Sequence, residues 1–297
     1  MTTRPALLIA GHGTRHEGAA GALRTLVRTL AERHPEVPVA GGFFGASASP
    51  LPLSGAVEEL AARGATRLIV VPLLMAPTGP IRESLPEAVA RAVAAHPGLG
   101  SVCLPELGPH PRLLEVLERR LDEALGGGAR RPADRARTTV LLVGRGAADP
   151  YANAEVVRAA RLLWEGRGFA GVETAFVTLA APDVPAGLDR CRVLAAAAPG
   201  ASGPGRTVVL PFFFFAGDLL ERLRMQTEGW AAAHPWAEVV AAEPIGAAPE
   251  LAAVIMERYR AAVADEAAGH GRAAAGDARP ATGSLPDAAL SAAGGQA

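Results

Sequence analysis

The chain has 297 residues, of which 49% are hydrophobic and 4% aromatic, and its 29 Lys and Arg against 30 Asp and Glu leave a formal charge of -1. This length fits one or two domains, each with its own core. The balanced charge predicts neither a nucleic-acid-binding surface nor a polybasic membrane patch. All 29 cations are arginine. A Schiff-base lysine, a pyridoxal-phosphate anchor and a Walker-A loop are therefore excluded.

Cysteine use and apolar runs bear on the compartment. Cys103 and Cys191 lie far apart in apolar segments and form no CxxC pair, so thiolate metal sites are not expected. Buried thiols of this kind fit a reducing compartment. The N-terminal apolar run is too short for a signal peptide, and the run 208–217 is too short to span a membrane. We expect a cytoplasmic protein that interacts with neither membranes nor nucleic acid.

In the first half of the chain, short apolar runs alternate with amphipathic ones. The continuous run Ile69-Val70-Val71 is typical of a parallel strand that is covered on both faces. Pro35 and Gly64 mark helix ends. Strands are expected at 6–10, 39–44, 67–74 and 101–104, and helices at 20–34, 53–63, 86–95 and 111–125. This alternation predicts an α/β domain with a parallel sheet.

The second half repeats the pattern after a Gly-, Arg- and Ala-rich segment without apolar periodicity, which we expect to be a linker. Strands are expected at 139–143, 172–179, 207–215 and 238–241, and helices at 152–165, 184–197, 219–234 and 249–263. The end of the chain is rich in Ala, Gly and Pro and predicts a disordered tail. The expected divisions are an N-terminal repeat at 1–125, a linker at 126–137, a C-terminal repeat at 138–264 and a tail at 265–297.

Three landmarks recur in the same order in both halves. Gly11-His12-Gly13 corresponds to Gly144-Arg145-Gly146, Ser49-Pro50-Leu51 to Ala181-Pro182-Asp183, and Val71-Pro72-Leu73 to Leu210-Pro211-Phe212. The chain is therefore expected to contain two tandem βα repeats, each with a mainly parallel sheet of about four strands flanked by helices. Ligand sites in such sheets lie at the carboxyl ends of the strands.

This rule singles out His12, which stands between two glycines directly after a buried strand. A neutral imidazole there can ligate a divalent metal or move a proton. A loop histidine that is hydrogen-bonded to the backbone is the alternative of equal weight. His16 follows four residues later and is a candidate for shared metal ligation. The run Phe212–Phe215 is expected to be core strand, with the alternative that its rings wall a flat ligand.

Together these motifs resemble the class II tetrapyrrole chelatases, in particular the long form of the sirohydrochlorin chelatases, in which two repeats are fused. The resemblance covers roughly residues 5–263. In the first half it rests on the segments 8–15, 38–43, 49–51, 70–73 and 107–111, and in the second on 143–146, 149–150, 153, 162–165, 210–213 and 217. It implies insertion of Co²⁺ or Fe²⁺ into sirohydrochlorin in cobalamin or siroheme biosynthesis. The tetrapyrrole and the metal ion are then the substrates, no cofactor is permanently bound, and a monomer carries both repeats.

The resemblance also assigns roles to single residues. The histidine of the family's first loop falls on His12, as metal ligand and proton acceptor. From their positions in the sequence, Glu83 and His16 are the nearest candidates for a further metal ligand. Arg15, Arg82 and Arg145 are expected to bind the carboxylates of the substrate.

Two positions depart from the family pattern. Pro80 stands where the family carries a second histidine, and Gly45 stands where it usually carries a glutamate. Two alternatives therefore stay open beside the chelatase. One is a non-catalytic relative that binds a tetrapyrrole or a metal. The other is a structural or regulatory relative that binds neither.

Overall fold

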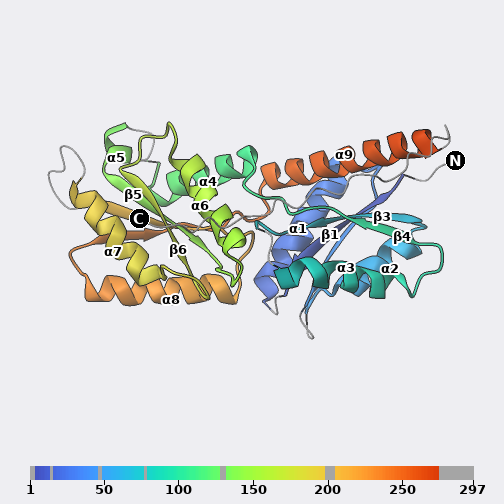
Figure 1. Ribbon diagram of the computed structural model, residues 1–297, viewed down its shortest axis with the longest axis horizontal. Coiled ribbons are helices and arrows are strands. Elements are labelled where there is room, and N and C mark those ends of the chain that lie inside the picture. The colour runs from blue at the N-terminus through green and yellow to red at the C-terminus, as the bar shows by residue number, and fades with distance from the viewer. Residues whose placement is uncertain are drawn as a thin grey trace, which may run out of the picture. The chain divides into compact units, whose positions relative to one another are not determined.

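The computed structural model describes residues 4–13, 16–45, 49–76, 79–127, 132–197 and 205–273. Residues 1–263 form one compact unit that holds both repeats, and 264–297 form a second unit, of which the end of one helix is described. The first unit contains two four-stranded parallel sheets with helices on their faces (Figure 1). The predicted α/β class with two repeats is confirmed.

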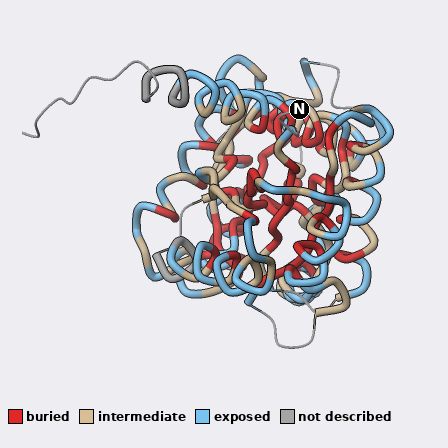
Figure 2. The backbone as a smooth tube through the Cα atoms, turned by 90° about the vertical axis from the view of Figure 1, so that its right-hand side faces the viewer, coloured by how far each residue is buried: buried red, intermediate tan, exposed pale blue. Residues whose placement is uncertain are grey.

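The first sheet has the strand order β2-β1-β3-β4. Its elements are β1 (Ala6–His12), α1 (Glu17–Arg33), β2 (Val39–Phe44), α2 (Leu53–Ala62), β3 (Arg67–Pro72), α3 (Gly79–Val93), β4 (Gly100–Cys103) and α4 (Pro111–Ala124). The central strands β1 and β3 are buried along almost their whole length, because helices cover both faces of the sheet (Figure 2). This burial explains the continuous apolar runs that the sequence shows there.

The second sheet repeats this order as β6-β5-β7-β8. Its elements are α5 (Pro132–Ala136), β5 (Thr138–Gly144), α6 (Pro150–Trp164), β6 (Gly171–Phe176), α7 (Val184–Ala197), β7 (Arg206–Pro211), α8 (Asp218–Ala233), β8 (Glu238–Ala241) and α9 (Pro249–Ala273). Ala10 pairs with Pro72 in the first sheet, as Val143 pairs with Pro211 in the second. The predicted alignment of His12 with Arg145 therefore holds in space.

The middle landmark of the repeat is shifted by one residue from its predicted alignment. Phe43 N donates to Leu51 O at 2.8 Å, and the equivalent Phe176 N donates to Pro182 O at 2.9 Å. Pro182 is therefore the counterpart of Leu51, not of Pro50. Matching proline with proline in the sequence was wrong, because the register is set by this backbone hydrogen bond.

The last helix of each repeat packs on the other repeat. α4 lies against β7 and α6, where Arg120 Nε donates to Pro244 O at 2.9 Å. α9 lies beside α1 and β1, and Tyr259 Oη donates to Pro5 O at 2.5 Å (Figure 1). The order of elements along the chain thus differs from their grouping in space.

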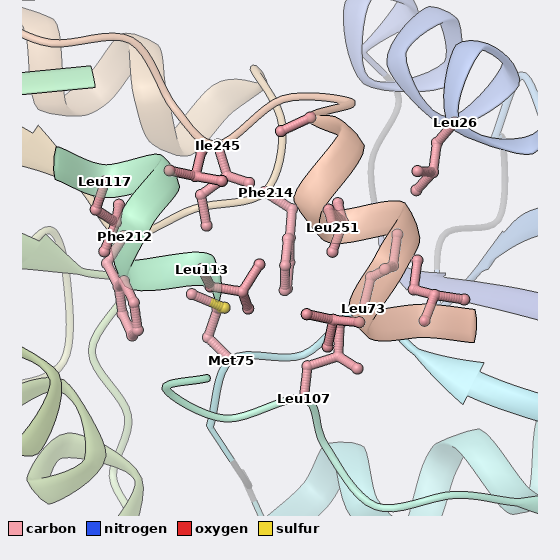
Figure 3. Packing of buried hydrophobic residues seen from close by; sticks show 14 of the residues in the cluster. Leu26, Leu73, Met75, Leu107, Leu113, Leu117, Phe212, Phe214, Ile245 and Leu251 are labelled. Carbon is pink, nitrogen blue, oxygen red and sulfur yellow. The ribbon is translucent and has the colours of Figure 1, made fainter. Parts of the chain in front are cut away.

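This exchange of helices creates one apolar core that spans both sheets. Leu113 and Leu117 of α4 pack with Phe212 and Ile245 of the second repeat (Figure 3). Burial of each such side chain stabilises the fold by about 1.5–3 kcal/mol. The two repeats therefore cannot separate without exposing this core.

Several predicted boundaries were wrong. The strand expected at 207–215 ends at Pro211, so Phe212–Phe215 lie in the connection to α8. The strand expected to reach residue 179 ends at Phe176, and the helix expected from Pro86 begins at Gly79. These ends are set by pairing with the neighbouring strands and by packing, which periodicity does not report.

The predicted linker and the predicted disordered tail both contain helix. The predicted linker includes the short helix α5, and α9 continues ten residues beyond its expected end at 263. The residues after 263 include Ala264, Glu266 and Ala267, which favour helix. The remainder of the predicted tail, 274–297, lies outside the described residues.

Candidate functional site

The carboxyl ends of both sheets border one cavity of about 450 Å³. Its walls come from the ends of β1, β3, β5 and β7 and from the first turns of α6 and α8. Small-molecule sites in proteins typically measure about 300–1,000 Å³. The cavity therefore lies where parallel sheets bind ligands, and it is formed by both repeats.

His12 is the last residue of β1 and lines this cavity. The imidazole is half-buried and packs edge-on against Phe44, with ring centroids 5.2 Å apart. The next residue, Gly13, is held by a hydrogen bond of 2.7 Å from its N to Phe44 O. Neither ring nitrogen has a hydrogen-bond partner among the residues that the structure describes. The imidazole is therefore available to a ligand.

Arg145 lines the cavity from the second repeat, at the position equivalent to His12. Its carbonyl oxygen accepts hydrogen bonds from Thr178 N at 3.0 Å and Thr178 Oγ1 at 3.1 Å. Asn153 holds the same loop, because its side chain accepts from Ala147 N at 2.9 Å and donates to Ala147 O at 2.8 Å. The backbone is thus fixed, while the guanidinium makes no hydrogen bond or ion pair within the described part of the chain.

Gly146 shows why this loop needs glycine. Its φ is +88°, and a Cβ at this position would lie 1.7 Å from Thr178 O. Any side chain would force the loop away from Thr178, and Arg145 would move with it.

The electrostatic setting keeps His12 neutral. Burial lowers the pKa of His12 below its ordinary value, and the positive charge of Arg145 lowers it further. At neutral pH the imidazole is therefore an unprotonated base with a lone pair for a metal ion or a proton.

The rest of the cavity is mainly apolar. The run Phe212–Phe215 lines it together with Phe43, Leu73 and Met75. The run is not the core strand that the sequence predicted, but Phe212, Phe213 and Phe214 are buried in the core clusters and the rings also wall the cavity, which was the alternative. Such a wall suits a flat conjugated ligand.

Sequence reasoning missed Asp218. This carboxylate begins α8 and lines the cavity. The sequence signal was present, since Asp218 ends the most apolar run of the chain, but an acidic residue at a helix start is common without any function.

The other residues singled out in the sequence do not join this cavity. His16 caps α1, with Nδ1 accepting from Gly18 N at 3.1 Å, and its Nε2 lies 3.5 Å from Glu221 Oε1 of α8. Glu83 is exposed on α3 and is not among the lining residues. Arg15 lies outside the described residues, and so do the side chains of Pro80 and Arg82.

Within the described ranges, no group of three or more His, Cys, Asp or Glu is placed to hold a metal ion. Both thiols are free, with Cys191 buried and Cys103 half-buried. None of the described helices combines the length and apolarity that a membrane-spanning segment needs.

Two parallel sheets with one shared cavity at their carboxyl ends define an α/β protein built from two similar repeats. The CbiX family model matches residues 6–124 and again residues 139–262. The chain therefore belongs to the CbiX family, with one copy of the family unit in each repeat.

Two curated relatives from Priestia megaterium are chelatases by name. A sirohydrochlorin cobaltochelatase is 32% identical over 206 residues, which cover 69% of this chain and 64% of that relative. A sirohydrochlorin ferrochelatase is 28% identical over 225 residues, which cover 75% of this chain and 78% of the relative. The chain thus matches less than two thirds of the length of the cobaltochelatase.

Among solved structures, SirB from Bacillus subtilis with Fe³⁺ matches with a TM-score of 0.70. The alignment covers 89% of this chain and 98% of that chain at 21% identity. At this level of identity, the likeness establishes the shared fold.

Proposed function

We propose that this protein inserts a divalent metal, Co²⁺ or Fe²⁺, into sirohydrochlorin, as a step of cobalamin or siroheme biosynthesis. The observation that carries the proposal is the cavity formed by both repeats, in which His12 and Arg145 face a common space beside an apolar wall. The named activities of the two Priestia megaterium relatives support it.

In this proposal His12 acts as metal ligand and proton acceptor. Imidazole nitrogen is a suitable ligand for both Co²⁺ and Fe²⁺. The lowered pKa of His12 supports this role, because a neutral imidazole does not repel the incoming cation. The metal ion is a substrate that passes to the macrocycle, so a closed set of protein ligands is not required.

Arg145 is proposed to bind carboxylate groups of the tetrapyrrole. Because its guanidinium has no hydrogen-bond or ion-pair partner in the described part of the chain, its donors are free for a carboxylate. Pairing with substrate carboxylates would also reduce the repulsion between Arg145 and the metal ion. Arg15 and Arg82 are proposed for the same task on the strength of their sequence positions. Glu83 is given no role in this proposed site, because its side chain is exposed and is not among the described residues that line the cavity.

A single chain is proposed to be the working unit, with the repeat boundaries near 125 and 138. Both walls of the cavity come from the same chain, which supports a complete site in a monomer.

A second candidate function is binding of the tetrapyrrole without metal insertion. Gly45 favours it, because a Cβ there would lie 3.1 Å from His12 Nε2, and glycine offers no carboxylate at this point. The shortage of metal-ligating groups among the described residues favours it as well.

Anaerobic insertion assays distinguish the two functions. The purified chain is mixed with sirohydrochlorin and Co²⁺ or Fe²⁺, and the absorption spectrum is followed against a protein-free control. We expect insertion well above the spontaneous rate and its loss in His12→Ala. The matched control is His96→Ala, which removes an imidazole that does not line the cavity. If the protein binds the pigment but inserts the metal no faster than the protein-free control, the second candidate is supported. If the insertion rate of His12→Ala equals that of wild type, the proposed role of His12 is contradicted.

A further inference from the structure

The cavity holds three titratable side chains among its described lining residues, namely His12, Arg145 and Asp218. His12 comes from the first repeat, and Arg145 and Asp218 come from the second. Arginine stays protonated in proteins. His12 and Asp218 are therefore the two groups of this described lining that can take up a proton.

Metal insertion requires a destination for two protons. As M²⁺ enters the macrocycle, two pyrrole N–H bonds break, two metal–nitrogen bonds form in their place, and no atom changes its oxidation state. A neutral imidazole accepts one proton and is then a cation without a free lone pair. A Cβ at Gly45 would lie 3.1 Å from His12 Nε2, but glycine has no side chain that could accept the other proton.

Asp218 is placed to fill this gap from the opposite repeat. It is the first residue of α8, its side chain is exposed, and that side chain makes no hydrogen bond or ion pair to any described residue. Asp218 follows Pro211 at the same distance along the chain as Gly79 follows Pro72, so the first repeat carries no counterpart.

We propose that Asp218 is a catalytic residue that accepts one of the two pyrrole protons, while His12 accepts the other once its lone pair has released the metal ion to the macrocycle. This inference rests on the proposed metal insertion. After insertion both groups return their protons to water, and the site regains its starting state. The two repeats thus contribute one proton acceptor each.

An acidic residue in the first turn of a helix also stabilises that helix through its dipole. A purely structural role predicts that Asp218→Asn lowers thermal stability and leaves the insertion rate of the folded protein unchanged. The test therefore needs a measured quantity that does not change when only the thermal stability of the protein changes.

The experiment compares wild type, Asp218→Asn, Asp218→Glu and the control Glu228→Gln, which removes a charge from the same helix outside the cavity. For each protein we measure kcat and KM for Co²⁺ with sirohydrochlorin, the affinity for metal-free sirohydrochlorin, and the rate ratio between H₂O and D₂O. We expect Asp218→Asn to lower kcat about 100-fold with unchanged pigment affinity, since general bases typically contribute 10²- to 10⁴-fold. The solvent isotope effect should rise, Asp218→Glu should recover part of kcat, and Glu228→Gln should match wild type.

Two outcomes would overturn the inference while the proposed function stands: a wild-type kcat in Asp218→Asn, or a raised KM for Co²⁺ at unchanged kcat, which would make Asp218 a metal-docking group. Wild-type protein without insertion above the spontaneous rate would defeat the proposed function and this inference with it. Because that result is seen with the wild-type protein alone, it is distinguished from a failure of the Asp218 inference, which needs the variants.

Discussion

The imidazole of His12 and the guanidinium of Arg145 occupy equivalent positions in the two repeats and line the same cavity. One repeat thus supplies a base and the other a permanent cation, and the charge of Arg145 contributes to the lowered pKa of His12. Two copies of one architecture give a site with unlike halves.

Removing the charge of Arg145 should raise the pKa of His12. In Arg145→Gln, the burial of His12 remains but the coulombic cause is gone, so the pKa moves up toward its ordinary value of 6.5 without passing it. NMR titration of the His12 ring in metal-free protein measures the shift. Arg145→Lys keeps the charge and serves as the control. An equal pKa in wild type and Arg145→Gln would contradict the coupling.

Gly146→Ala should destabilise the fold strongly. The new Cβ would meet Thr178 O at 1.7 Å in a backbone conformation that alanine disfavours, and we expect a loss of about 3 kcal/mol in the free energy of unfolding. Urea unfolding measures it. The control is Gly229→Ala in α8, where a Cβ meets no atom within 4 Å and should stabilise the helix by about 0.5–1 kcal/mol. Similar effects in both variants would show that the loop tolerates a side chain.

Ionisation of Glu118 should make the contact between α4 and the second repeat, and with it the stability of the fold, depend on pH. Its carboxylate lies 2.9 Å from Arg167 Nε and 2.8 Å from Arg135 Nη1. Burial raises the pKa of Glu118, but the hydrogen bonds from these two arginines outweigh burial and hold the pKa below 4.5. The folded state then binds this proton less readily than the unfolded state does, so the contribution is present above pH 4.5 and is lost as the pH falls through the folded pKa.

We therefore expect Glu118→Gln to lower the free energy of unfolding by about 1–3 kcal/mol at pH 7 and to have a smaller effect at pH 3. Chemical denaturation at both pH values tests this, with Glu115→Gln, an exposed residue of the same helix, as the control. A loss of equal size at pH 7 and pH 3 would rule out the carboxylate as its cause.

The two cysteines should differ in reactivity. The pKa of Cys191 is raised to about 12 by burial and by the charge of Glu173, and its side chain is fully buried. Cys103 is half-buried, and burial raises its pKa as well. Since the thiolate is the reactive form, native protein at pH 8 should show slow labelling of Cys103 and none of Cys191. Cys103→Ser should abolish labelling until the protein is unfolded, and rapid labelling of Cys191 in the native state would contradict its burial.

The sequence by itself predicted the α/β class, the two repeats and the place of His12. Continuous apolar runs such as Ile69–Val71 identify strands that helices cover on both faces, and the matched glycines around His12 and Arg145 align the repeats. These features are local, because they depend on side-chain type and spacing within a few residues. The same local rules placed the end of β7 wrongly, since the phenylalanines after Pro211 are apolar in either setting.

Only the tertiary structure decided which segments meet. α4 and α9 exchange partners, and His12 and Asp218 line one cavity although more than half of the chain separates them. No periodicity encodes these contacts, because they depend on how two sheets pack through a common core. Composition and spacing therefore determined the parts, and long-range packing determined the site.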